Sequence, residues 1–317
     1  MASRLQFARY SLEDSVRDLL KKEISERVSE TRLDSDFDAT ILADIGSYPL
    51  RRHLPDDVLR GIQTFTTEGG HALVLSNLPA QDFPLTPVSG FGDEVGLAMT
   101  NAIHLGLIRI LGRIPFAVGY ENSGHLIRNV VPNPAAVGTT SSWGSDSEFF
   151  WHSDNPQQQF GPIGSDPRLY TPPYLTFFAI RNQEQVPTEV AALDDVVAGL
   201  DEKTRLGLMA AEFEVGVPYS NDRDATGPLM NTPVLEVGPD GRYRVRYDRG
   251  TTVGRTDAAR ETLTRWSAAL GAMPSVAFVL GTGDFMIFDN HRVLHRRKSF
   301  TPAPDATARW LRRCYAA

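Results

Sequence analysis

Two histidines, one carboxylate and one arginine follow each other in an order that could build an iron centre. His152 and Asp154 are close together, whereas His295 and Arg309 lie far downstream. Two imidazoles and one carboxylate on one face of Fe(II) leave the other positions open for a cosubstrate and O₂. A guanidinium after the last ligand can hold the distal carboxylate of 2-oxoglutarate in a bidentate fork. The ordered set therefore predicts a non-haem Fe(II) site that uses 2-oxoglutarate.

The spacing of these residues supports two ligand assignments. In an extended segment, His152 and Asp154 point to the same face, as two neighbouring ligands must. His291 is a rival for His295, because both positions share parity on a strand. On a helix the two histidines could bind zinc together, but the preceding Phe285–Asp289 stretch is strand-like. Geometry alone leaves the choice between them open.

The stretch Gly283–Arg297 resembles the Asp-Asn-x-Arg-x-x-His-Gly-Arg segment of clavaminate synthase-like Fe(II)/2-oxoglutarate dioxygenases. That group includes taurine dioxygenase-type proteins and the asparagine and arginine β-hydroxylases, and the resemblance runs from about residue 116 to the C-terminus. It implies that His295 is the third metal ligand. Two positions depart from the pattern: Arg296 replaces the usual Gly, and Asp154 stands where the amino-acid hydroxylases usually carry Glu.

The resemblance also implies residues for the cosubstrate. Arg309 is expected to bind the C5 carboxylate of 2-oxoglutarate, and Thr188 is the candidate for a hydroxyl that assists. On the expected strand from Arg309 to Tyr315, Arg313 shares parity with Arg309, while Arg312 faces the other way. If the shared face looks into the protein, two buried guanidiniums need anionic partners, which a dicarboxylate and a substrate carboxylate would supply. The alternative is a solvated basic strand edge.

Five further positions are expected to contact the substrate. By the same resemblance, Glu121 receives an α-amine, Ser141 and Ser142 line the site, and Asp248 contacts a side chain. Arg313 is assigned to an α-carboxylate. Each of these residues could equally be an ordinary surface polar residue. Together they favour an L-amino acid with a polar or cationic side chain, with arginine, lysine and histidine first and asparagine and glutamine next.

Composition limits the remaining classes of function. The 317 residues carry a formal net charge of −7 and are 41% hydrophobic, which is typical of a globular protein with an ample core. No basic stretch is interleaved with aromatics, so no nucleic-acid partner is expected. No apolar run has the length of a membrane span, and the N-terminus lacks the apolar core of a signal peptide. The single cysteine, Cys314, excludes an internal disulfide and favours the cytoplasm.

The first third of the chain is predicted to be mainly helical. Hydrophobic residues recur at helical spacing from Ser11 to Leu20 and again after Pro55. The clearest helix is expected from Asp93 to Leu111, with an apolar stripe of Val95, Met99, Ile103, Leu107 and Ile110. His104 lies beside that stripe and is interpreted as a helix-face residue and not as a ligand.

From residue 115 onward the pattern changes to short strands. Gly238–Gly241 is expected to form a hairpin turn, and helical insertions are expected at Leu193–Leu200 and Asp257–Leu270. The expected strands are 116–119, 126–131, 174–180, 213–217, 234–237, 243–247, 277–280, 285–289 and 310–315. These elements predict an α+β fold with a double-stranded β-helix, or jelly roll, and flanking helices. One domain, 1–317, is expected, with 1–114 as helical support and 115–317 as the jelly-roll core.

The expected activity is an Fe(II)/2-oxoglutarate-dependent oxygenase that hydroxylates a free or carrier-tethered amino acid and forms succinate and CO₂. Within the same class, a taurine dioxygenase-like enzyme for a sulfonate or another small acid is an alternative. Outside it, a metal-binding or sugar-binding jelly roll without oxygenase activity is a second alternative. Such a protein would not need Arg309. The sequence leaves the oligomeric state open.

Overall fold

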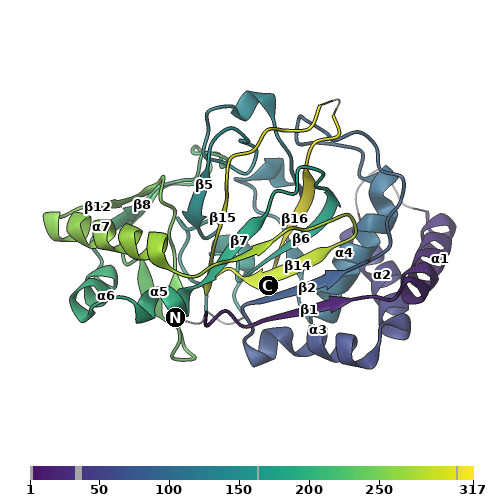
Figure 1. Cartoon of the computed structure of the whole chain (residues 1–317), viewed down its shortest axis with the longest axis horizontal. Coiled ribbons are helices and arrows are strands. Elements are labelled where there is room, and N and C mark those ends of the chain that lie inside the picture. Colours follow the sequence, from purple (N-terminus) through teal and green to yellow (C-terminus); the bar gives the residue numbers. More distant parts are fainter. Residues whose placement is uncertain (1–2, 33–37, 163, 305) are drawn as a thin grey trace.

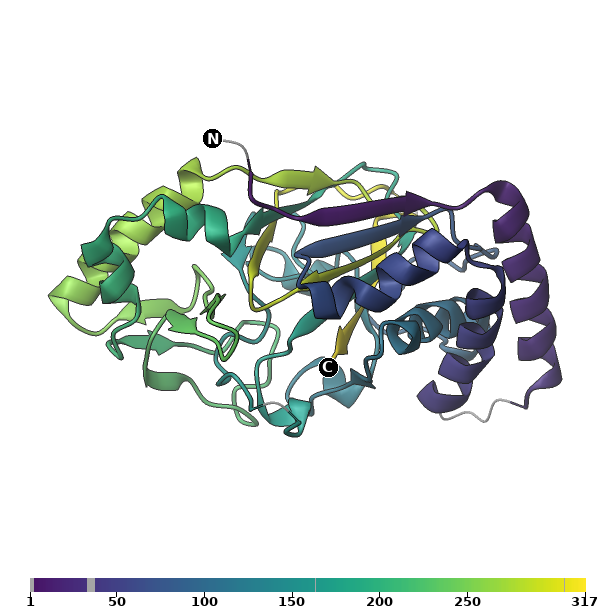
Figure 2. The same ribbon diagram turned by 90° about the horizontal axis from the view of Figure 1, so that it is seen from below.

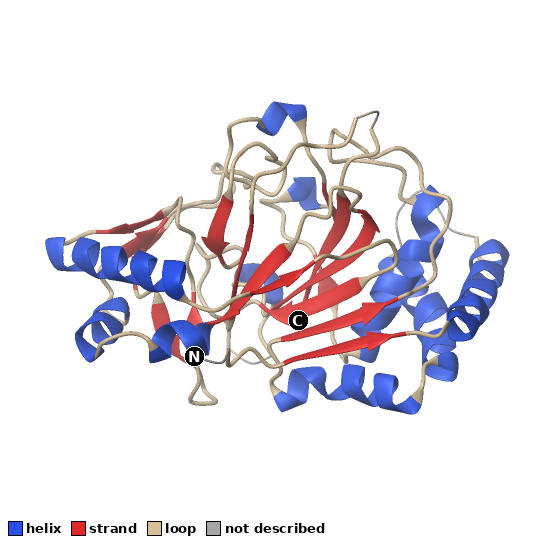
Figure 3. Ribbon diagram, in the orientation of Figure 1, coloured by secondary structure: helices blue, strands red, loops and turns tan. Residues whose placement is uncertain are grey.

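The computed structural model describes residues 3–32, 38–162, 164–304 and 306–317. Strands occupy the middle of the molecule, and helices lie at its two ends (Figures 1 and 3). The α-helices are α1 Asp14–Glu30, α2 Ala39–His53, α3 Asp56–Glu68, α4 Ala98–Ile110, α5 Leu193–Ala198, α6 Glu202–Leu208 and α7 Asp257–Ala272. Short 3₁₀ helices are η1 Val95–Leu97, η2 Asn122–Gly124, η3 Pro134–Ala136 and η4 Pro167–Leu169.

The largest sheet contains strands from both ends of the chain. Its order is β1-β2-β14-β6-β16-β3, and β4 pairs with β16 beside β3. Strands β1 and β2 pair in parallel, and the other strand pairs described in this sheet are antiparallel. The strands are β1 Phe7–Ser11, β2 Ala72–Ser76, β3 Pro115–Phe116, β4 Arg128–Val130, β6 Tyr174–Arg181, β14 Phe285–Asp289 and β16 Trp310–Ala316.

A second, four-stranded sheet has the order β13-β7-β15-β5 and is antiparallel throughout. Its strands are β5 Phe149–His152, β7 Thr188–Ala192, β13 Val276–Phe278 and β15 Val293–Arg297. The two sheets share one buried apolar cluster, in which Val190 and Val293 of the second sheet pack with Leu175, Phe288 and Leu311 of the first. The sheets therefore face each other across a common core.

Two small sheets with α6 and α7 form the end of the molecule opposite the N-terminal helices (Figure 1). One has the order β12-β8-β9, and the other is the hairpin β10-β11, whose connection is the predicted turn at 238–241. Gly241 in this turn has a φ of 76°, a conformation that glycine adopts at no steric cost. The strands are β8 Phe213–Val215, β9 Leu229–Thr232, β10 Leu235–Val237, β11 Tyr243–Val245 and β12 Thr252–Gly254.

The helices of the first third stack against one face of the large sheet (Figure 2). Helices α2 and α4 cross so closely that a Cβ on Gly46 would lie 1.8 Å from the Ala102 carbonyl oxygen. Because α4 lies between α2 and the sheet, almost all of its residues are buried, including His104. The expected apolar stripe therefore covers only part of the buried surface of α4. The prediction was wrong for Val95, which lies in η1 and is 51% exposed.

Two strands interrupt the region that the sequence predicted to be mainly helical. The apolar run of β2 is buried because β2 lies between β1 and β14 in the sheet, with helices packed on one face. A run buried on both faces lacks the alternation that identifies a strand, which explains the omission. The expected helix after Pro55 and the expected strand Phe285–Asp289 are confirmed. Within the described part of the chain, no helix combines the length and apolar character needed to cross a bilayer.

Candidate metal centre and active site

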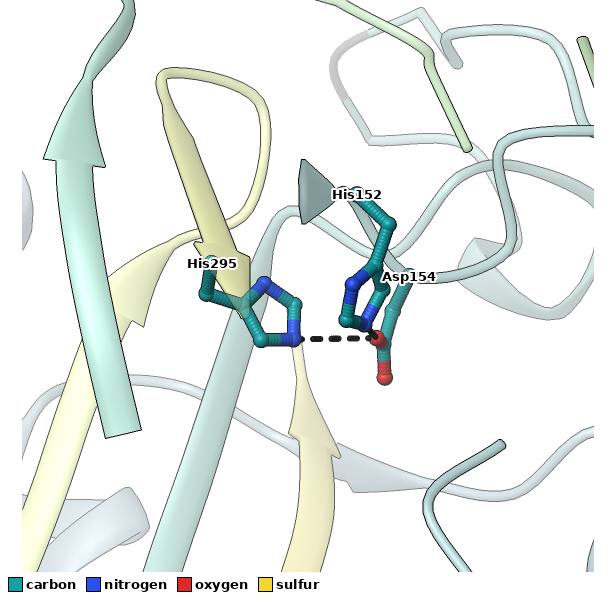
Figure 4. A group of neighbouring side chains, drawn as sticks. All are labelled: His152, Asp154 and His295. Atoms are coloured by element: carbon teal, nitrogen blue, oxygen red, sulfur yellow. Dashed lines mark ion pairs between the residues drawn. The ribbon is translucent and has the colours of Figure 1, made fainter. Parts of the chain in front are cut away.

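The second sheet brings His152, Asp154 and His295 together (Figure 4). His152 ends β5 and is the register partner of His295 in the neighbouring strand β15. Asp154 Oδ1 lies 3.5 Å from His152 Nε2 and 3.4 Å from His295 Nε2. One ligand atom from each residue lies within 4.8 Å of the others, and all three residues are buried. The donor set of two imidazoles and one carboxylate fits Fe(II) with open positions.

Neighbouring groups fix the tautomer of His152 and keep His295 neutral, and both are forms in which an imidazole can bind a metal. His152 Nδ1 lies 2.7 Å from the Phe150 carbonyl oxygen, to which it must donate, so the lone pair of Nε2 faces Asp154. His152 Nε2 is buried and makes no hydrogen bond. Burial and the neighbouring His152 lower the pKa of His295 to about 4, which keeps that imidazole neutral at physiological pH. A neutral imidazole is the form that binds a metal.

Asn290 fixes the backbone of the carboxylate ligand. Its side chain accepts a hydrogen bond from the Asp154 backbone N–H at 2.8 Å and donates to the Asp154 carbonyl oxygen at 3.0 Å. Burial alone would raise the pKa of Asp154, but the Arg313 guanidinium holds it well below its usual range. Asn290 belongs to the motif stretch Gly283–Arg297 and directly precedes His291, but the sequence alone did not indicate that its side chain binds the Asp154 backbone.

The two other histidines considered from the sequence lie outside this group. His291 Nε2 lies 3.1 Å from the Thr171 carbonyl oxygen, and its ring packs edge-on against Phe160. His104 Nε2 lies 2.8 Å from Thr176 Oγ1 inside the helical layer. The structure thus places His295, and not His291, beside His152 and Asp154.

A cavity between the sheets reaches from this group to Arg309 and Arg313 at β16. The predicted parity is correct, since both arginines line the cavity, whereas Arg312 turns away and donates to Asn129 in β4 and to Asn101 in α4. Arg309 is 4% exposed, and its guanidinium makes no ion pair with any acidic side chain that the structure describes. Burial, followed by the nearby Arg297, lowers the pKa of Arg309 to about 9.

Thr188, the candidate for a cosubstrate hydroxyl, lies beside Arg309 in the cavity. Arg309 Nη2 lies 3.4 Å from Thr188 Oγ1, and both residues line the cavity. A buried guanidinium with a hydroxyl beside it and no carboxylate partner is suited to an incoming anion. This part of the cavity therefore has the chemistry to bind a carboxylate group of a dicarboxylate.

A second cluster surrounds Glu121. Arg313 donates to Glu121 Oε1 at 2.6 Å and to Asp154 Oδ2 at 2.8 Å. The Tyr315 hydroxyl donates to Glu121 Oε2 at 2.7 Å. Arg128, which sequence reasoning did not single out, places its guanidinium 3.6 Å from Glu121. Glu121 is thus held by several donors before any substrate arrives.

The remaining predicted contact residues differ in their placement. Ser142 and Asp248 line the cavity, and Asp248 forms an isolated antiparallel bridge with His152. Burial raises the pKa of Asp248. Ser141 is not among the residues that line the cavity; its hydroxyl accepts a hydrogen bond from the Gly144 backbone N–H inside its own loop. The structure therefore does not place the Ser141 hydroxyl at the cavity surface.

Comparison with known proteins finds a family match in the second half of the chain. Residues 177–315, fewer than half of the 317, match the model described as taurine catabolism dioxygenase TauD, TfdA family. The matched segment contains Thr188, His295, Arg309 and Arg313, while His152 and Asp154 lie before it. The protein is an Fe(II)/2-oxoglutarate-dependent dioxygenase.

Curated relatives and a solved structure cover most of the chain. Enduracididine beta-hydroxylase of Streptomyces hygroscopicus is 27% identical, over 82% of this chain and 81% of its own. L-asparagine oxygenase of Streptomyces coelicolor (strain ATCC BAA-471 / A3(2) / M145) is 26% identical, over 82% of this chain and 76% of its own. A structure of asparagine oxygenase with Fe(II), 3-hydroxyasparagine and succinate superimposes with a TM-score of 0.80 at 24% identity, covering 97% of this chain and 92% of that chain.

Proposed function

We propose that this Fe(II)/2-oxoglutarate-dependent dioxygenase hydroxylates an unactivated C–H bond of a free L-amino acid with a polar or cationic side chain. The observation that carries the proposal is the cavity itself, which joins the His152, Asp154 and His295 group to two buried arginines. The names of the relatives agree with it, since enduracididine beta-hydroxylase and L-asparagine oxygenase both act on amino acids.

Different residues would bind the metal, the cosubstrate and the substrate. His152, Asp154 and His295 would hold Fe(II), and Arg309 with Thr188 would bind the distal carboxylate of 2-oxoglutarate. Bound iron and 2-oxoglutarate supply the oxidising chemistry with O₂ and give succinate and CO₂. The protein positions the reacting C–H bond and excludes water, to which the aromatic rings of Phe149 and Phe288 beside the histidines contribute.

Three residues would orient the substrate. Arg313 is suited to the α-carboxylate, because a bidentate guanidinium–carboxylate contact fixes direction as well as distance. Glu121 is suited to the α-ammonium group, and Asp248 to a donor on the side chain. Substrate binding must then loosen the ion pairs that Arg313 makes with Glu121 and Asp154.

We infer that the two facing sheets form the double-stranded β-helix expected from the sequence, within a single domain. The arrangement supports this, since the shared core lies between the sheets and the helices cover the outer side of the larger one. We also place the protein in the cytoplasm on the buried free thiol of Cys314, which suits a reducing compartment.

Succinate formation tests the proposed activity. Purified protein is given Fe(II), 2-oxoglutarate and O₂, and each proteinogenic amino acid is added in turn. We expect one or a few amino acids to stimulate succinate formation strongly, with a product heavier by one oxygen atom. Stimulation by taurine or another amine-free acid, and by no amino acid, would contradict the proposal and favour a sulfonate-type enzyme.

A further inference from the structure

Glu121 lies between two buried arginines on neighbouring strands. Arg128 in β4 is the register partner of Arg313 in β16, and the two are 2% and 7% exposed. Arg313 Nη2 lies 2.6 Å from Glu121 Oε1, and Arg128 Nη1 lies 3.6 Å from the same oxygen. One carboxylate is therefore shared by two cations.

Arg128 is fixed in this place by contacts of its own. Its Nε donates to Ser142 Oγ at 3.1 Å, and its guanidinium lies 4.3 Å from the centre of the Trp143 ring. Nη2 of Arg128 is buried and makes no hydrogen bond. Glu121 is the acidic side chain within ion-pair distance of Arg128 among the residues that the structure describes. Arg128 does not itself line the cavity, but its positive charge lies directly behind Glu121 and Ser142, which do.

The charges at this end balance without a substrate. Glu121, Asp154 and Asp248 are the acidic residues that line the cavity. Once iron is bound, Asp154 and the chelating carboxylate of 2-oxoglutarate offset the two charges of Fe(II). At this end Arg128 and Arg313, both within ion-pair distance of Glu121, carry two positive charges, and Glu121 and Asp248 carry two negative ones. Of the other cations that line the cavity, Arg296 is paired with Glu189, and Arg297 lies near Arg309 at the cosubstrate end. A buried site with balanced charge best accepts a ligand with no net charge, because any excess charge stays unpaired.

We propose that Arg128 is a specificity-determining residue that makes this site select amino acids of zero net charge, those with a neutral polar side chain, over cationic ones. The proposal rests on the proposed function and narrows its substrate class. It reverses the order expected from the sequence, which counted Glu121 and Asp248 but not Arg128. A proton on Asp248 would only make the site more positive, so the preference does not depend on the state of that residue.

L-citrulline and L-arginine test the proposal as a matched pair, because they have nearly the same shape and differ by one positive charge. Anaerobic titration calorimetry of the protein with Fe(II) and 2-oxoglutarate measures both dissociation constants, and glutamine and lysine give a second pair. We expect the neutral member of each pair to bind about tenfold more tightly or better, the scale of one unpaired charge at partly buried distances. Arginine binding as tightly as citrulline would overturn the proposal.

Two variants separate charge from shape. In Arg128→Met the site gains a net negative charge, so the preference for citrulline over arginine should fall at least about tenfold or reverse. In Arg128→Lys the positive charge stays, so the preference should persist even if both ligands bind more weakly. A preference unchanged in Arg128→Met would also overturn the proposal. If Arg128→Met does not fold, the wild-type pairs and Arg128→Lys still decide the question.

The same titrations distinguish failure of this inference from failure of the proposed function. Tight binding of arginine or lysine would refute the role of Arg128 and leave the amino-acid hydroxylase intact. Binding of taurine or another amine-free acid, with no binding of any amino acid, would refute both.

Discussion

At the scale of single residues, the candidate metal centre depends on groups that orient the ligands. The Phe150 carbonyl oxygen selects the tautomer of His152, and the Asn290 side chain clamps the backbone of Asp154 at both its N–H and its carbonyl group. The two Asn290 contacts join Asp154, just after β5, to the turn before β15, two segments far apart in the sequence. Ligands held in this way keep their geometry before a metal arrives.

The first prediction concerns the choice between two histidines. His152→Ala and His295→Ala should each abolish activity and weaken Fe(II) binding sharply, because a facial site cannot lose an imidazole and keep its geometry. His291→Ala should retain iron binding, since His291 lies against the Thr171 carbonyl oxygen and outside the group. Iron titration of the three purified variants measures this. Full iron binding by His295→Ala with loss in His291→Ala would move the ligand to His291.

The second prediction concerns the cosubstrate. Arg309→Ala should leave iron affinity nearly intact and raise the dissociation constant for 2-oxoglutarate steeply, by about 2–5 kcal/mol in binding free energy, as when a buried charge pair is truncated. Arg309→Lys should restore only part of the loss, because an ammonium group lacks the planar fork. Titration of 2-oxoglutarate into the iron-loaded variants decides it. An unchanged constant in Arg309→Ala would show that another residue binds the distal carboxylate.

Sequence reasoning reached the residues whose role follows from local spacing. The positions of Arg309 and Arg313 on one face of β16, and of Arg312 on the other, followed from strand parity, and the structure confirms them. Arg128 and Tyr315 were missed for a physical reason. Their role arises only when β4 pairs with β16 and brings both beside Glu121, and nothing in the local sequence specifies that pairing.

At the scale of elements, α4 carries a buried neutral histidine against the large sheet. The Thr176 hydroxyl donates to the Cys314 carbonyl oxygen at 2.9 Å, so its oxygen accepts the proton of His104 Nε2. Burial, with a smaller effect of Arg312, lowers the pKa of His104 from 6.5 to about 3. The helix therefore docks on the sheet with His104 in its neutral form.

The third prediction follows from this shift. At a pH between the folded pKa of about 3 and the unfolded value of 6.5, His104 is protonated in the unfolded chain and neutral in the folded protein. Stability therefore falls as the pH drops below the unfolded value, by at most about 1.4 kcal/mol per pH unit. His104→Gln, which can still donate to Thr176, should lack this part of the slope. Urea unfolding of both proteins at about pH 7 and about pH 5.5 measures it. Equal pH slopes in the two proteins would show that folding does not lower the pKa of His104.

Elements were predictable where one pattern dominated. The helix after Pro55, the turn at 238–241 and strand β14 have the expected position because cap, turn and strand signals agree there. Strands β1 and β2 were missed, and β3 is shorter than expected. β2 pairs with distant β14, β1 pairs with β2, and β3 pairs with distant β16, so tertiary context overrides local propensity in all three strands.

At the scale of the whole molecule, the site lies between the two sheets and takes residues from both. The second sheet contributes the histidines, and the first contributes Arg313 and Tyr315. Ligands that bridge the sheets should therefore stabilise the whole fold and not one element.

The fourth prediction measures this coupling. Fe(II) and 2-oxoglutarate, each at about a hundred times its dissociation constant, should each stabilise the protein by about 2.7 kcal/mol and raise its melting temperature. In Arg309→Ala the same concentration of 2-oxoglutarate should add little to the effect of the metal. Anaerobic thermal melts of both proteins, with metal alone as the control, test this. An equal increment from 2-oxoglutarate in both proteins would contradict binding at Arg309.

Anaerobic absorption spectroscopy tests the central claim most directly, that His152, Asp154 and His295 hold iron to which 2-oxoglutarate chelates. We predict a weak visible charge-transfer band when both Fe(II) and 2-oxoglutarate are present with the wild-type protein. Neither component alone should give the band, and His295→Ala should not form it. Wild-type protein that binds Fe(II) but develops no band with 2-oxoglutarate would contradict the account.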